Sequence, residues 1–125
     1  AVDAKKTSEG KWKIFTHGGR KNTGIDAIDF SKQAEEYGAG EILLTSMDKD
    51  GTRSGYDLEL ISKITSSISI PVIASGGAGK LEHLYDAIKI GGASAVLAAS
   101  IFHFGKFTIK ETKEYLKLNN VPIRL

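Results

Sequence analysis

Two aspartates in this sequence could act as a general acid and a general base. Asp3 and Asp50 follow different short apolar runs, so they could flank one ligand from two strands. Asp50 precedes Gly51, and an ordinary turn aspartate is at least as good an interpretation of it. Asp3 is harder to explain without a function, because a carboxylate at an apolar strand end is costly when it has no partner. Asp3 is therefore the stronger catalytic candidate.

A glycine-rich loop with serines near it could bind phosphate. The apolar run 70–74 leads into Ser75-Gly76-Gly77-Ala78-Gly79, and a helical pattern starts at Leu81. Glycine amides can approach a ligand closely, and the N-terminus of the following helix favours an anion. A tight turn that binds nothing fits the same residues equally well. Ser100, at the end of the next apolar run, adds a second hydroxyl and favours phosphate binding.

Two common phosphate-binding motifs are excluded for this loop. A Walker A loop needs a glycine six positions before its lysine and a serine or threonine after it, but Lys80 has Ala74 and Leu81 at those places. The dinucleotide-binding fingerprint also fails, because Glu82 stands where its third glycine would fall. The loop belongs to neither of these classes.

The composition indicates one globular domain and excludes several other classes of protein. The chain has 125 residues, is 41% hydrophobic and carries a net charge of +2, which is too small to indicate nucleic-acid binding. It has no cysteine, and His17, His83 and His103 share no ligand spacing, so we expect no metal and no cofactor. No run approaches the ~20 apolar residues of a membrane span, and no signal peptide opens the chain. We therefore expect a cytoplasmic protein.

The pattern of apolar residues predicts alternating strands and helices. The expected strands cover residues 1–5, 11–16, 41–46, 70–75 and 93–99, and helices follow at 27–37, 57–68, 81–90 and 108–118. The segment 11–16 alternates as a β-ribbon does, with Trp12 as a packing residue, and 17–24 is expected to be a loop.

Three strand ends repeat at the spacing of a βα unit. Thr45-Ser46, Ala74-Ser75 and Ala99-Ser100 each close a strand, at intervals of 29 and 25 residues. Four βα units in succession imply a parallel sheet with right-handed crossovers. A closed (β/α)8 barrel takes ~250 residues, so residues 1–125 are expected to form a single (β/α)4 half-barrel with a β-ribbon insertion after the first strand. A four-stranded doubly wound sheet is the alternative.

Several motifs resemble the cyclase subunit of imidazole glycerol phosphate synthase, a family of histidine biosynthesis. The resemblance runs from Val2 nearly to Leu125 and corresponds to the C-terminal half of the family's barrel. The motifs that carry it are Asn22-Thr23-Gly24, Gly38 to Ser46, Asp48 to Thr52, Ser54 to Asp57, Ile73 to Lys80 and Ala98 to Phe104. The sister isomerase of the pathway shares the Asp-Gly-Thr and Ser-Gly-Gly loops but not the segments 54–57 and 102–104.

The resemblance implies a reaction and a set of roles. A glutaminase partner supplies ammonia, which attacks a ribulosyl carbonyl of an imidazole ribonucleotide with a phosphate at each end. Asp3 matches one of two catalytic aspartates, Asp50 is its helper, and Glu41 matches a charged ring at the ammonia entrance. The positions implied to contact substrate or phosphate are Thr45, Gly51, Thr52, Ser75, Gly76, Gly77 and Ser100.

The sequence also departs from the family in ways that affect its expected activity. The other catalytic aspartate and the second phosphate site belong to the family's first barrel half, which this sequence lacks. The chain starts inside an expected strand without an initiator methionine, so we expect a fragment or an isolated half-barrel, inactive alone. Open edges at the Asp3 strand and the 95–99 strand would favour pairing with a complementary N-terminal half or a second copy. A fragment of the sister isomerase, or a non-catalytic phosphate-binding half-barrel that self-assembles, are the alternatives.

Overall fold

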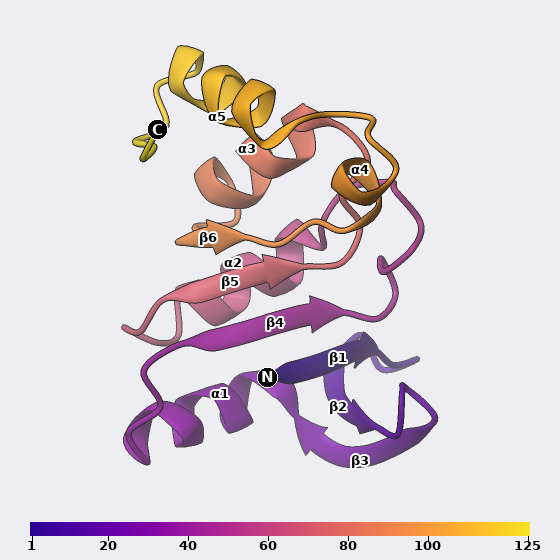
Figure 1. Ribbon diagram of the computed structural model, residues 1–125. Coiled ribbons are helices and arrows are strands. Elements are labelled where there is room, and N and C mark those ends of the chain that lie inside the picture. The colour runs from indigo at the N-terminus through magenta and orange to yellow at the C-terminus, as the bar shows by residue number, and fades with distance from the viewer.

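One six-stranded sheet organises the molecule, which is described over residues 1–125 by a computed structural model. The strands are β1 (Val2–Lys6), β2 (Trp12–Thr16), β3 (Lys21–Asp26), β4 (Ile42–Ser46), β5 (Val72–Ser75) and β6 (Ala95–Val96). Their order across the sheet is β3-β2-β1-β4-β5-β6, so the sheet ends at β3 and β6 and does not close into a barrel (Figure 1).

The strands β1, β4, β5 and β6 are parallel and form the half-barrel that the repeat predicted. Asp3 pairs with Thr45, Thr45 pairs with Ser75, and Ala74 pairs with Val96. In Figure 1 these four arrows point the same way, and the loops that follow them gather at one end of the sheet. The expected fold, four parallel βα units with a ribbon after the first strand, is confirmed.

Helices cover one face of this sheet and leave the other face open. They are α1 (Ala27–Glu36), α2 (Leu58–Thr65), α3 (Leu81–Lys89), α4 (Ser100–His103) and α5 (Ile109–Leu118). Burial alternates along β4, where Ile42, Leu44 and Ser46 are buried while Leu43 and Thr45 are only partly covered. This alternation is the period of a strand with one packed face. The core therefore lies between the sheet and the helix layer, where the largest fully buried side chains include Leu44, Leu60, Ile64 and Leu84.

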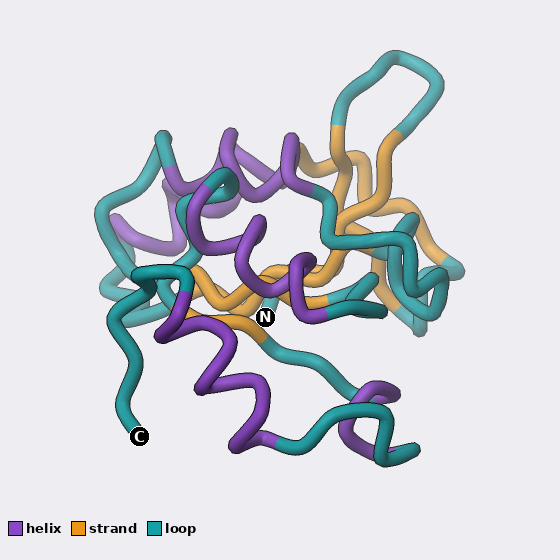
Figure 2. Tube along the Cα trace, turned by 90° about the horizontal axis from the view of Figure 1, so that it is seen from above, coloured by secondary structure: helices purple, strands orange, loops and turns teal.

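The ribbon after β1 is longer than the sequence predicted. We expected residues 17–24 to be a loop, but Lys21–Asp26 forms β3 and pairs antiparallel with β2. The segment has no apolar alternation that would mark it as a strand. It forms an edge strand through its contacts with β2, and the Thr23 hydroxyl donates to the Ile14 carbonyl at 2.7 Å. Figure 2 shows the ribbon standing out beside the helix-covered part of the sheet. Trp12 is a packing residue, as expected, with 2% of its surface exposed.

The ribbon also corrects the expectation that the Asp3 strand has an open edge. Ala4, Lys5 and Lys6 of β1 pair with Ile14, Lys13 and Trp12 of β2. Only the start of β1 lacks a partner on that side, whereas β6 is an outer strand of the sheet. β6 is shorter than the expected strand 93–99, although Ser94 and Leu97 still donate their N–H groups to Val72 and Ala74. Its single neighbour supports only a short ladder.

Side-chain caps begin two of the helices near their expected starts. The Asp57 carboxylate accepts the Leu60 N–H at 3.1 Å and begins α2. Thr108 and Glu111 form a capping box at the start of α5. Helix α2 ends at Thr65, so Ile68 packs against the core from the segment that follows and not from the helix. None of the helices is long and apolar enough to span a membrane.

Candidate functional site

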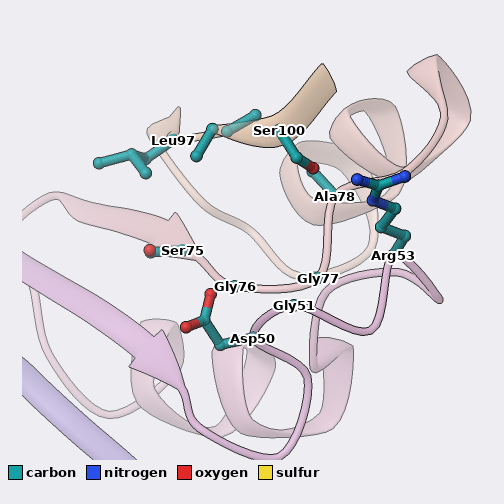
Figure 3. Close-up of a pocket in the computed structure, with 11 residues that line it drawn as sticks. Asp50, Gly51, Arg53, Ser75, Gly76, Gly77, Ala78, Leu97 and Ser100 are labelled. Carbon is teal, nitrogen blue, oxygen red and sulfur yellow. The ribbon is translucent and has the colours of Figure 1, made fainter. Parts of the chain in front are cut away.

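A small cavity lies at the carboxyl ends of β5 and β6. Its volume is about 120 Å³. The lining residues come from the loop after β4, from the end of β5 and the loop after it, and from the segment that joins β6 to α4. They are Asp50, Gly51, Arg53, Ser75, Gly76, Gly77, Ala78, Leu97, Ala98, Ala99 and Ser100 (Figure 3). Three βα loops thus converge on one hollow at the end of the sheet where parallel α/β proteins bind ligands.

The backbone of this cavity carries donors without acceptors. The N–H groups of Gly76, Gly77 and Ala78 donate to no acceptor of the protein, and the same is true of Ala98 and Ala99. Gly76 and Gly77 are themselves buried. Backbone N–H groups away from water are almost always paired, so consecutive free donors mark a place for an acceptor from outside the chain. A run of such N–H groups suits an anion with several oxygens.

The glycines of the loop are also required by packing. Gly76 has φ +92° and Gly77 has φ +111°, a region that L-residues avoid. A Cβ on Gly76 would lie 2.8 Å from the Ser46 carbonyl oxygen, and a Cβ on Gly77 would collide with the Gly55 carbonyl. The loop after β5 therefore presses on the loop after β4. These glycines were predicted for a different reason, the approach of their amides to a ligand.

Hydrogen bonds join the three loops around the cavity. The Gly55 N–H donates to the Gly77 carbonyl at 2.8 Å, and the Tyr56 hydroxyl donates to the Leu97 carbonyl at 2.7 Å. Tyr56 is buried, and burial raises the pKa of its hydroxyl well above the usual range, so the hydroxyl stays a donor. The cavity is consequently held by backbone and by one buried side chain.

A row of side chains crosses the uncovered face of the sheet beside the cavity. The register sets Asp3, Thr45 and Ser75 next to one another on β1, β4 and β5. Thr45 and Ser75 are partly buried, whereas Asp3 is exposed, because nothing in this chain covers the open face in front of it. Asp3 therefore lies in the same row as a cavity residue, but it is not enclosed in an apolar site.

The structure brings most of the expected site residues together. Asp50, Gly51, Ser75, Gly76, Gly77 and Ser100 line the cavity, and Figure 3 shows the Asp50 carboxylate directed toward the Ser75-Gly76 stretch. Thr52 does not line it: its hydroxyl donates to the Lys49 carbonyl at 2.7 Å and stays within the turn. Glu41 precedes β4 and is exposed at the opposite end of the sheet.

The sequence reasoning missed some residues of the cavity. Ala78, Leu97 and Ala98 contribute to its wall, and Arg53 contributes the one cationic side chain. Arg53 stands within the loop that carries Asp50, and a basic residue in a loop beside a candidate phosphate site was the available signal. His83 lies outside the cavity and holds the end of the same loop, since its Nδ1 accepts the N–H groups of Gly79 and Lys80 at 3.0 and 3.3 Å.

A second group of charged residues, centred on Glu59, lies outside the cavity and holds the ribbon against α2. Lys6 and Lys63 lie over the Trp12 ring at 4.7 and 4.9 Å, and both pair with Glu59. Hydrogen bonds from Lys6 and then Lys63 lower the pKa of Glu59. The Trp12 indole N–H donates to Asp57 at 3.1 Å. This cluster fastens the ribbon to α2.

The amino-acid sequence is similar to proteins described as belonging to histidine biosynthesis. A sequence model described as histidine biosynthesis protein matches residues 1–108. A relative from Endomicrobium trichonymphae, named imidazole glycerol phosphate synthase subunit HisF, is 64% identical over 124 residues, which cover 99% of this chain and 47% of that protein. The chain spans about half the length of the curated relative it matches.

Proposed function

This chain belongs to the histidine biosynthesis protein family, and we propose that it is the C-terminal half of the cyclase subunit of imidazole glycerol phosphate synthase. The observation that carries the proposal is the cavity with consecutive free N–H donors at Gly76, Gly77 and Ala78. The cavity binds one terminal phosphate of a phosphoribulosyl-formimino imidazole ribonucleotide. Charge-assisted hydrogen bonds of this kind contribute about 1.5–3 kcal/mol each.

The row on the open face then orients the rest of the substrate. A ligand whose phosphate sits in the cavity extends past Ser75 and Thr45 toward Asp3. Asp3 is the general acid and base, and Asp50 and Gly51 help to hold the substrate from the loop after β4. Thr52 stabilises the turn of that loop through its hydrogen bond to the Lys49 carbonyl. Ammonia from a glutaminase partner enters past Glu41 at the other end of the sheet. It condenses with the ribulosyl carbonyl and water is released. The same nitrogen then closes the imidazole ring onto the formimino carbon as the bond from that carbon to the other nucleotide's amine breaks, which gives imidazole glycerol phosphate and an aminoimidazole carboxamide ribotide.

The exposed position of Asp3 explains why the proposed lyase needs more than this chain. The open face becomes an enclosed site only when a complementary N-terminal half covers it, and that half supplies the second catalytic carboxylate and second phosphate site. The chain alone, or paired with a copy of itself, has no cyclase turnover. We place the reaction in the cytoplasm.

Phosphate binding tests this proposal directly. We expect glycerol 3-phosphate, titrated into the isotope-labelled chain, to shift the NMR signals of the Gly76, Gly77 and Ala78 amides to saturation. Glycerol is the matched neutral control and is expected to leave them in place. Shifts confined to other parts of the chain, or none, would contradict the proposal.

A further inference from the structure

Arg53 is the one cationic side chain that lines the cavity, and it has no partner of opposite charge. It is exposed, and the ion pairs of the molecule, Lys6–Glu59, Lys63–Glu59 and Lys110–Glu114, leave it free. Lys106 stands nearby, but its ammonium already donates to the Gly79 carbonyl at 2.6 Å. A free guanidinium beside a cavity of free N–H groups is available for a ligand with oxygen acceptors.

The cavity contains a carboxylate whose negative charge the Arg53 guanidinium can balance. Asp50 is the only carboxylate among the lining residues, and its negative charge opposes an anion in the same hollow. Figure 3 shows Arg53 on the other side of the Gly77-Ala78 stretch from Asp50. A phosphate between them meets repulsion from one side, which the guanidinium balances from the other. Neutral N–H groups alone do not supply that balance.

Backbone geometry fixes the position from which the Arg53 side chain extends. Its φ is +56°, which is uncommon for a residue with a side chain and costs free energy. Gly79 permits this position, because a Cβ there would collide with the Arg53 carbonyl. The turn after β4 and the loop after β5 are thus packed so that an arginine emerges at the edge of the cavity. Such strain is common where a side chain must be held for function.

An exposed aromatic ring supports the guanidinium. The Cζ atom of Arg53 lies 5.8 Å from the centroid of the Phe104 ring, and Phe104 has 71% of its surface exposed. Arg53 and Phe104 also line a small hollow together with Ser100, which belongs to the cavity as well. The ring therefore holds the cation beside the cavity while the N–H faces of the guanidinium stay open.

We propose that Arg53 is the phosphate-binding cation of this site, a guanidinium that binds the dianionic end of a phosphate monoester and is positioned by its cation–π contact with Phe104. The inference rests on the proposed phosphate site and adds the residue that makes it selective for charge. Phe104 is a positioning residue that acts through Arg53 and does not touch the phosphate.

The test measures the dissociation constants of glycerol 3-phosphate and of inorganic phosphate by NMR titration of the chain, followed at the Gly76 and Gly77 amides. We expect Arg53→Gln to raise both constants about 10- to 100-fold, the range for losing one charge-assisted hydrogen-bonding group. Arg124→Gln is the matched control, because Arg124 is exposed, carries the same charge and lies outside the cavity. It is expected to change the constants about twofold or less through net charge.

A double-mutant cycle tests the role of the ring. Phe104→Leu is expected to weaken binding about 2- to 5-fold, and the Arg53→Gln/Phe104→Leu double variant is expected to bind no worse than Arg53→Gln alone. Additive losses would overturn the positioning role of Phe104. Wild-type affinity in Arg53→Gln would overturn the proposal for Arg53 while the phosphate site stands. Absence of saturable shifts of the amide NMR signals in the unmodified chain would contradict the phosphate site itself and, with it, the role proposed for Arg53.

Discussion

Gly77 shows how one residue serves both packing and binding in this molecule. Its N–H is free for an anion, its carbonyl accepts the Gly55 N–H, and its missing Cβ lets the Gly55 carbonyl approach. Substitutions at Gly77 therefore change the cavity and the fold together. A loss of binding in such a variant does not by itself identify the ligand site, and Arg53 gives the cleaner test because its side chain is exposed.

We expect Gly77→Ala to destabilise the protein by more than its backbone conformation alone explains. An L-residue in the left-handed region costs roughly 1–2 kcal/mol, and the collision with the Gly55 carbonyl adds to that figure. Gly18→Ala is the matched control, since Gly18 has φ +65° and open space around its Cβ position. Urea denaturation with circular dichroism measures both variants. Equal losses of unfolding free energy would show that the loops relax without cost.

The residue types at the site were readable from the sequence, but their arrangement was not. Asp50, Ser75 and Ser100 were found because each ends or follows an apolar run, and strand ends of a parallel sheet meet at one edge. Arg53 was missed because a basic residue in a loop is a weak signal by itself, and its position at the cavity depends on a left-handed turn and on the distant Phe104. The exposure of Asp3 was also unpredictable, since it depends on what covers the open face.

Among the secondary-structure elements, the helices could be predicted from local sequence, whereas the second strand of the ribbon could not. The helices were predictable because their caps and apolar spacing are local, as at Asp57 and Thr108. Residues 17–24 were predicted to be a loop because the pairing of Lys21–Asp26 with β2 comes from tertiary contact and not from the residues of that strand. β6 was predicted too long, because the small residues around it gain no second neighbour in the sheet.

Helix α5 permits a prediction about pH. Hydrogen bonds from the Thr108 N–H, at 2.7 Å, and then from its hydroxyl lower the pKa of Glu111. A carboxyl whose pKa is lower in the folded state stabilises that state above its unfolded pKa, and the benefit is lost as the pH falls through the folded pKa. Glu111→Gln should therefore be less stable than the unmodified chain at pH 7, and the difference should shrink below about pH 4.3, the usual pKa of glutamate.

Thermal unfolding of both proteins between pH 7 and pH 3 measures this difference. Glu9→Gln is a suitable control, because Glu9 is exposed in the turn between β1 and β2 and forms none of the molecule's ion pairs. A difference for Glu111→Gln that stays constant with pH would mean that the capping box does not depend on the charge of the glutamate.

At the scale of the whole molecule, the uncovered face of the sheet is the feature that connects fold and proposed function. Helices bury one face, while Asp3, Thr45 and Ser75 lie on the other together with Leu43, Ile73 and Leu97. A sheet face with polar residues near the strand ends and apolar ones below fits the interior of a barrel, which side chains fill in layers. The second half of such a barrel would enclose Asp3 and leave the cavity at its mouth.

The catalytic role proposed for Asp3 can be measured as turnover in a completed barrel. The chain joined to a complementary N-terminal half is supplied with the imidazole ribonucleotide substrate and free ammonia, and imidazole glycerol phosphate is measured. We predict that Asp3→Asn lowers kcat by about 10²–10⁴, the contribution of a general acid or base, with little change in KM. Asp29→Asn, an exposed aspartate on α1, should retain normal turnover. Normal kcat in Asp3→Asn, or a completed barrel that forms no product with ammonia, would contradict the account.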